Sequence, residues 1–371
     1  MMSTCDAPVT LVTGFPNSKA SHLVGDLLAN GRGQVCVVVP PREASDAERY
    51  AAALPPGLAA RFRYYVGEPW AIDMGLAGSE YRELCRAVTR IQHAAMVTGP
   101  SFGKEPFDDL HVGSTREALE LAQAAERLES LIVHSGLVVS GDRQGYVSEA
   151  ELVAGQRFAG PGPAGLARAE LMARRHMDRL PVVVVRSGQV VGPSDSGAVD
   201  VLEGVYLLIL LILSAPQDLS ALLPDWGDAP VHVVPIDHYL RAVDVISSDP
   251  QALGQTVHLT DPQPMTVRLA FNRCMKIRER LAEEEGLVLP SASSALRRDG
   301  VLRDSLQTLL WRPRTFINMS FRNVRYGTEI AERLLGPHGL ACPSLESYFE
   351  QLVRHVLRVA GATSLAKVAG S

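Results

Sequence analysis

The chain of 371 residues is 46% hydrophobic and 21% charged, and its formal net charge is −5. This composition is typical of a globular protein with a large core, in one large or two intergrown domains. The acidic balance argues against a general nucleic-acid binder. The five cysteines are scattered without the spacing of metal ligands, and no basic-then-apolar signal peptide opens the sequence. We therefore expect a cytoplasmic protein with no metal site.

The first predicted element is a buried strand at residues 9–12, a short run of apolar and β-branched side chains. A turn over residues 14–18 leads into a helix that carries apolar residues on one face and ends at Asn30-Gly31. A second apolar strand follows at residues 35–39. Strand, tight turn, helix and strand form the unit that places a dinucleotide pyrophosphate on a helix N-terminus.

This stretch resembles the extended form of the short-chain dehydrogenase/reductase superfamily, whose turn reads Thr-Gly-x-x-Gly-x-x-Gly. Thr13 and Gly14 match, whereas Asn17 and Ala20 stand at the second and third glycines. The second glycine lets the backbone approach the phosphate, so Asn17 partly obstructs the phosphate site, although asparagine tolerates a positive φ. The resemblance implies a Rossmann-type, doubly wound parallel α/β sheet that binds NADP or NAD weakly or not at all. A βαβ unit without a ligand is the alternative.

The resemblance also implies where the rest of the cofactor would lie. No acid follows the second strand, so Arg42 is expected to pair with the 2′-phosphate of NADP, the alternative being a solvated loop arginine. Glu68 follows the predicted strand at residues 62–66, where the family has the acid that faces the adenine. A further strand at residues 90–97 contains small residues that let the backbone pass beneath the cofactor. The full expected cofactor-binding set is Thr13, Gly14, Phe15, Asn17, Ala20, Arg42, Glu68, Ala94 and Ala95.

Residues 141–170 extend the likeness to one branch of the superfamily. The pattern Gly-Asp-Arg-x-Gly-x-Val-x-Glu that begins at Gly141 resembles the fatty-acyl and acyl-thioester reductases, the male-sterility type of NAD-binding domain. That branch continues Asn-Pro-Tyr-x-x-Ser-Lys-x-x-x-Glu, and here Pro161 and Glu170 hold the register. The catalytic tyrosine position is then Gly162, and the lysine position is Leu166.

Two more catalytic positions are implied by the same resemblance. The predicted strand at residues 130–139 carries Ser135 at the catalytic serine, and His111 stands where the family has its asparagine. The family's tyrosine passes a proton to the carbonyl oxygen, and losing such an acid costs about 10²–10⁴ in rate. No lysine lies between Lys104 and Lys276, so a shifted register supplies none. We therefore expect a degenerate active site that retains only Ser135.

The remaining sequence predicts two units. Residues 1–192 form the dinucleotide-binding domain, completed by residues 231–262, which begin with a returning strand. Residues 193–230 and 263–371 form a smaller, mostly helical domain of substrate type. The apolar segment at residues 201–216 is too short to span a bilayer, which needs about 20 residues. We expect this segment to wall an apolar cavity that opens toward Ser135 and Gly162; a fully buried helix and a partner contact are the alternatives.

Three functions fit these observations. The first is a catalytically impaired relative that binds NAD(P) and acts as a binding or regulatory module. The second is a divergent NADP-dependent reductase of a lipid-like carbonyl or acyl thioester. The third is a structural protein without a ligand, which the retained Thr13, Gly14 and Glu68 disfavour. The expected ligand is a lipid-like or acyl small molecule, with no membrane span, and a homodimer or protein partner is compatible with all three.

Overall fold

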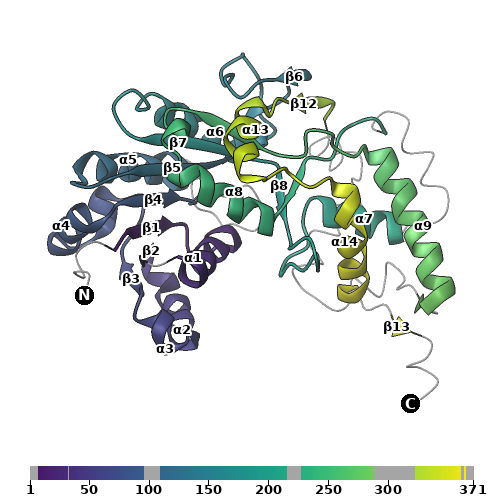
Figure 1. Cartoon of the computed structure of the whole chain (residues 1–371), viewed down its shortest axis with the longest axis horizontal. Helices are drawn as coiled ribbons and strands as arrows, with labels where there is room; N and C mark the ends of the chain where they lie inside the picture. The colour runs from purple at the N-terminus through teal and green to yellow at the C-terminus, as the bar shows by residue number, and fades with distance from the viewer. Residues whose placement is uncertain are drawn as a thin grey trace.

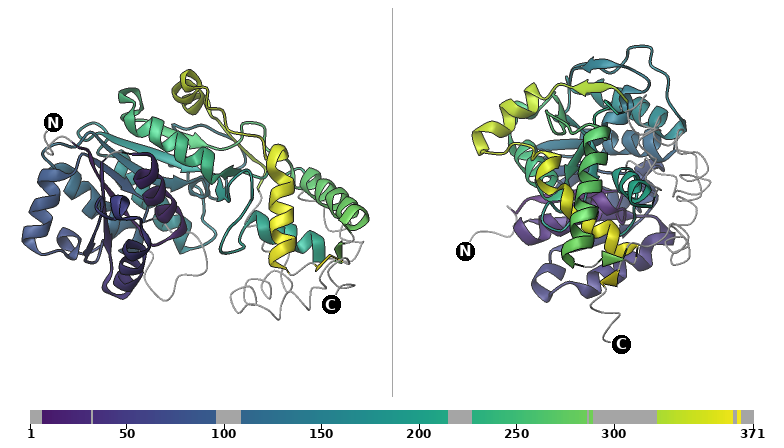
Figure 2. Two further views of the ribbon diagram at one scale, coloured as in Figure 1. Left: turned by 60° about the horizontal axis from the view of Figure 1, so that its bottom comes forward. Right: turned by 90° about the vertical axis from the view of Figure 1, so that its right-hand side faces the viewer.

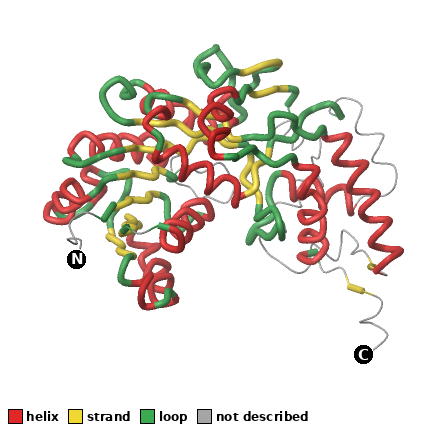
Figure 3. Tube along the Cα trace, in the orientation of Figure 1, coloured by secondary structure: helices red, strands yellow, loops and turns green. Residues whose placement is uncertain are grey.

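The computed structural model describes residues 7–31, 33–95, 109–214, 227–285, 287–288, 322–360 and 363–364. Its centre is a seven-stranded, wholly parallel sheet in the order β10-β7-β5-β4-β1-β2-β3 (Figures 1 and 3). The strands are β1 (Val9–Thr13), β2 (Gln34–Val39), β3 (Phe62–Val66), β4 (Arg90–His93), β5 (Ser130–Gly136), β7 (Val182–Ser187) and β10 (Thr256–Leu259). Near-continuous runs such as Val-Val-Val-Val in β7 suit a sheet covered on both faces.

Helices cover both faces of this sheet. One face carries α1 (Ser18–Asn30), α2 (Ala44–Ala53), α8 (Ile236–Ser248) and α13 (Glu329–Leu335), whose apolar side chains share a core with alternate residues of the strands. The other face carries α4 (Gly78–Ala87), α5 (Ser114–Ala124) and α6 (Pro161–Arg174). The short α3 (Pro56–Ala59) leads into β3. The predicted Rossmann-type, doubly wound fold is confirmed (Figure 2).

The strand order reverses between β1 and β4. From β1 the chain moves outward through β2 and β3, then returns to β4 and moves outward the other way. Ligands of doubly wound sheets lie at the carboxyl ends of the strands, at such a reversal. The end of β1 and the start of α1 are therefore the structural position of a dinucleotide site.

The C-terminal part is helical. In it α7 (Val205–Ser214), α9 (Val267–Glu285) and α14 (Leu345–Val359) pack together beside the sheet (Figure 1). Every side chain of α7 from Val205 to Leu213 is at most 7% exposed and belongs to this core. The described part of the segment is thus the fully buried helix of the alternative, covered by α9 and α14, and the cavity opening toward Ser135 and Gly162 stays a prediction; residues 215–216 lie outside the described residues.

Three two-stranded sheets lie outside the main one. The predicted strand at residues 231–235 forms as β9 (Val233–Pro235), but it pairs with β8 (Gln189–Val191) and not with the seven-stranded sheet. Here β6 (Gly145–Val147) pairs with β12 (Val324–Tyr326), which joins two segments far apart in sequence. The third consists of β11 (Leu287–Val288) and β13 (Thr363–Ser364). Among the described helices, none combines the length and the apolar character needed to cross a bilayer.

Candidate cofactor and active site

The turn between β1 and α1 depends on Gly14. Its φ is +90°, a conformation that side chains other than glycine rarely adopt. A Cβ atom added there would lie 2.5 Å from the Ala94 carbonyl oxygen at the end of β4. Any larger residue would therefore push the two neighbouring strand ends apart. The turn retains the close approach of β1, α1 and β4 on which a dinucleotide site of this fold depends.

Asn17 occupies the start of helix α1. Its Oδ1 accepts a hydrogen bond from the Ala20 backbone N–H at 2.8 Å, and its Nδ2 donates to the Ala94 carbonyl oxygen at 2.9 Å. The side chain thereby caps one of the N–H groups that a phosphate would otherwise use. Other groups of the first turn carry no such side-chain cap, so a cofactor phosphate fits with fewer donors than an all-glycine turn offers.

Arg42 and Trp70 meet at the carboxyl ends of β2 and β3. The Arg42 guanidinium lies 5.9 Å from the centre of the Trp70 ring, and its Nε lies 3.4 Å from Glu43 Oε1. Glu68 is exposed directly after β3. An aromatic ring, a cation and a carboxylate thus follow β2 and β3 at the carboxyl edge of the sheet, the edge at which doubly wound folds bind their ligands. Phe15 does not reach this place, because it is buried against Tyr50 and Phe62.

A buried histidine links β1, β4 and α5. His93 Nδ1 lies 2.8 Å from Thr13 Oγ1, and its Nε2 lies 3.0 Å from Thr115 Oγ1. Burial, with the nearby His111, lowers the pKa of His93 to about 3, so the ring is neutral. His111 is itself buried in the π-helical turn Asp109–Gly113 that precedes α5. The Thr13 hydroxyl therefore supports the strand ends, and both histidines are interior groups.

Ser135 is held inside the structure. The residue is 2% exposed, and its hydroxyl donates to Glu170 Oε2 on α6 at 2.7 Å. Glu170 also accepts two bonds from Arg186 Nε, at 2.9 and 3.0 Å, and one from Nη2. Because alternate residues of a strand face opposite sides, Ser135 and Arg186 both point to the α6 face of the sheet. Ser135 is therefore hydrogen-bonded to the buried ion pair that Glu170 forms with Arg186.

Hydrogen bonds connect this ion pair to residues in the C-terminal half of the chain. Arg186 Nη1 donates to His258 Nε2 at 3.1 Å, and His258 Nδ1 donates to the Gly327 carbonyl oxygen at 2.8 Å. Burial and the Arg186 charge lower the pKa of His258 to about 3. Glu149 accepts bonds from the His258 backbone N–H and from the Ile330 and Ala331 N–H groups that begin α13.

Gly162 and Leu166 lie on α6 and both are buried. Leu166 Cδ2 would lie 3.8 Å from a Cβ atom at Gly136, the last residue of β5, and the Ser187 carbonyl oxygen would lie equally close. The lysine position thus faces the end of β5 with an isobutyl group, and the tyrosine position is a buried glycine on the same helix. They contribute neither a proton donor nor a charge.

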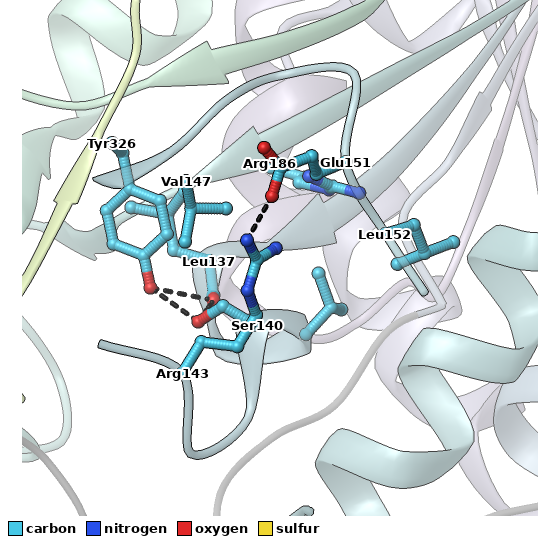
Figure 4. Close-up of a pocket in the computed structure, with 9 residues that line it drawn as sticks. Leu137, Ser140, Arg143, Val147, Glu151, Leu152, Arg186 and Tyr326 are labelled. Carbon is cyan, nitrogen blue, oxygen red and sulfur yellow. Dashed lines mark hydrogen bonds and ion pairs between the residues drawn. The ribbon is translucent and has the colours of Figure 1, made fainter. Parts of the chain in front are cut away.

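Tyr326 is a hydroxyl-bearing side chain near this edge that sequence reasoning missed. It reaches from β12 to the turn after β5, where its hydroxyl lies 2.6 Å from Ser140 Oγ and donates to the Leu137 carbonyl oxygen at 3.1 Å (Figure 4). Burial raises the pKa of Tyr326. The shallow pocket around it is lined by Leu137, Val139, Ser140, Arg143, Val147, Glu151, Leu152, Arg186 and Tyr326. Within the described residues, no cluster of three or more His, Cys, Asp or Glu side chains could hold a metal ion.

Comparison with known proteins identifies the family. A model of the NAD-binding domain family described as "Male sterility protein" matches residues 10–243, more than half of the chain. The chain belongs to this family. The resemblance to the extended short-chain dehydrogenases and to their male-sterility branch is thereby confirmed, and with it the NAD-binding type of fold. No curated protein matches the sequence.

Solved structures share the architecture of this male-sterility domain. The terminal R domain of the myxalamid PKS-NRPS pathway is 23% identical, with a TM-score of 0.75 over 96% of this chain and 92% of that one. A reductase (R) domain of a nonribosomal peptide synthetase from Mycobacterium tuberculosis is 18% identical, with a TM-score of 0.69 over 96% and 94%. UDP-glucuronic acid 4-epimerase from Bacillus cereus, solved with NAD, is 16% identical, with a TM-score of 0.57 over 94% and 96%. At these identities the likeness is one of fold.

Proposed function

We propose that this protein binds NADP(H) at the carboxyl edge of its sheet and serves as an acyl-binding or regulatory module, with hydride transfer impaired. One observation carries the proposal: the site keeps the dinucleotide turn at Gly14, whereas Gly162 and Leu166 on α6 supply neither a proton donor nor a charge. NADP(H), when bound, supplies or accepts a hydride. A scaffold that holds it without a proton donor beside the carbonyl loses about 10²–10⁴ in rate.

The Arg42–Trp70 pair supports the choice of NADP over NAD. A guanidinium binds a phosphate by charge-assisted hydrogen bonds, and the Trp70 ring, 5.9 Å from the Arg42 guanidinium, makes a cation–π contact with it. Glu43, at 3.4 Å, competes for the same cation but is its immediate neighbour on a solvent-exposed turn. The site therefore offers the 2′-phosphate a preoriented partner.

Replacing Arg42 by alanine is expected to weaken NADPH binding about 10- to 100-fold while NADH binding changes less than about threefold, because only NADPH carries the 2′-phosphate. Isothermal titration calorimetry of both cofactors measures this. Arg49→Ala is the matched control, since Arg49 is an exposed arginine on α2 that pairs with Asp46. Equal losses for the two cofactors would contradict a 2′-phosphate contact.

Turnover tests the impairment directly. With acyl thioesters and aldehydes as substrates, NADPH oxidation is expected to fall about 10²–10⁴ below the common range of about 1–10³ per second. The measurement is the absorbance of NADPH at saturating substrate. Ordinary turnover would sink the proposal.

The alternative is a divergent reductase, and Tyr326 is the observation that favours it. Its hydroxyl and that of Ser140 lie at the same edge as Gly136 and could donate a proton in place of the absent tyrosine. If turnover is found, its loss in Tyr326→Phe, or in Ser135→Ala, decides which hydroxyl acts. Turnover that survives both changes would leave the Ser140 hydroxyl or solvent water as the proton donor.

A further inference from the structure

Lys19 carries an ammonium group that has no carboxylate beside it among the described residues. It lies in the first turn of α1, and among the described residues its only polar contact is the Ser187 hydroxyl, with Nζ 3.5 Å from Oγ. The ammonium also stands 5.2 Å from the centre of the Tyr239 ring on α8. Burial lowers the pKa of Lys19 to about 8, as expected for a cation that has lost water and gained no counter-ion. A desolvated, unpaired cation in a ligand-binding fold points to an anionic or oxygen-rich ligand.

The position of Lys19 shows which part of a dinucleotide it would meet. Ser187 is the last residue of β7, so the ammonium lies at the carboxyl edge of the sheet. In a doubly wound sheet the adenosine half lies over the β2 side and the second nucleotide half over the strands beyond the reversal. Here those strands are β4, β5 and β7. Lys19 therefore lies on the side of the sheet where the nicotinamide half would bind, and Arg42 lies after β2 on the side of the adenosine half.

Lys19 also approaches the region that Leu166 leaves without charge. A Cβ atom at Gly136 would touch Leu166 Cδ2 from the α6 face and the Ser187 carbonyl oxygen from β7, each at 3.8 Å. Lys19 reaches Ser187 from the α1 and α8 face of the sheet. The family's lysine would carry its charge on α6, where this chain has Leu166. Here the ammonium of Lys19 lies instead on the other face of the sheet, at the paired ends of β5 and β7.

We infer that the Lys19 ammonium binds the nicotinamide-side phosphate and ribose oxygens of NADP(H). This inference rests on the cofactor binding proposed above. The other groups that face it add no counter-charge. Tyr239 is neutral because burial raises its pKa, and His134 is neutral because burial, with Lys19 nearby, lowers its pKa. The two ring nitrogens of His134 form hydrogen bonds with the Tyr239 hydroxyl and with Gln92 Oε1. A cofactor oxygen would be the strongest partner available to Lys19.

The test compares two ligands that share the adenosine half. NADPH and 2′,5′-ADP are titrated by calorimetry into the native protein, Lys19→Met, Lys19→Arg and the control Lys276→Met, which alters an exposed lysine on α9. Lys19→Met is expected to weaken NADPH at least about tenfold and 2′,5′-ADP less than about twofold, because 2′,5′-ADP lacks the atoms that Lys19 meets. Lys19→Arg restores most of the NADPH affinity by returning the charge.

Three outcomes overturn the inference. If the native protein binds NADPH and Lys19→Met binds it as tightly, Lys19 is not a cofactor ligand, while the proposed function stands. Equal weakening of both ligands in Lys19→Met would mean that the change disturbs the whole dinucleotide turn. If the native protein binds neither ligand, the proposed cofactor binding itself fails and this inference falls with it.

Discussion

Replacing Arg186 by methionine is expected to lower the free energy of unfolding by about 3–5 kcal/mol. The substitution leaves Glu170 as a buried carboxylate that is 0% exposed and loses three charge-assisted bonds. Within the part of the chain that the structure describes, the Ser135 hydroxyl and the more distant Arg174, 3.9 Å away, remain to stabilise it. Urea unfolding followed by circular dichroism measures the change.

Two further variants separate the ion pair from general damage. Arg179→Met alters an arginine whose side chain is 82% exposed, and it should change stability by less than about 0.5 kcal/mol. Combining Arg186→Met with Glu170→Gln removes both charges, so the double variant should recover part of the lost stability. A double variant less stable than Arg186→Met alone would show that the carboxylate does not depend on this arginine.

Replacing Leu210 by alanine is expected to cost about 2–5 kcal/mol of unfolding free energy, because the side chain is 2% exposed in the core that α7 forms with α9 and α14. Urea unfolding again measures the loss. Leu269→Ala is the matched control on α9, where the leucine is 40% exposed, and it should cost less than about 1 kcal/mol.

A ligand measurement accompanies the Leu210 variant. If α7 walled a lipid cavity, Leu210→Ala would alter the binding of a fluorescent fatty acid at little cost in stability. The packing of α7 predicts the reverse: a large loss of stability, and no change in fatty-acid affinity for the fraction that stays folded. A stability loss as small as that of Leu269→Ala would contradict the core assignment.

Much of the fold could be predicted from sequence because its signals are local. The apolar, β-branched runs of β1, β2 and β7 and the spacing of buried residues in α1 are properties of single segments. The strand at residues 233–235 shows the limit: its run is visible, but its pairing with β8 depends on the path of the chain, which no single segment contains.

The candidate site was less predictable because side chains from distant segments build it. In the sequence, Asn17 only replaces the second glycine of the family's turn. Its hydrogen bond to the Ala20 backbone N–H is visible only in the folded helix. In the sequence, Glu170 only fixes the alignment with the family's pattern, and no neighbouring residue indicates its hydrogen bond with Ser135. Trp70 reaches the site from the turn after β3, and Tyr326 reaches it from β12. Lys19 contacts Ser187, which lies 168 residues along the chain.

The carboxylate of Glu149 joins segments that are synthesised far apart in time. It binds the Ile330 backbone N–H, 181 residues further along, and also holds His258 at the edge strand β10. During synthesis from the N-terminus, the β5 side of the sheet therefore emerges from the ribosome long before its last partners exist. Until α13 arrives, Glu149 must stay hydrated, and the edge at β10 lacks its cover. The hydrogen bonds of Glu149 can therefore be completed only after Ile330 and Ala331 have left the ribosome.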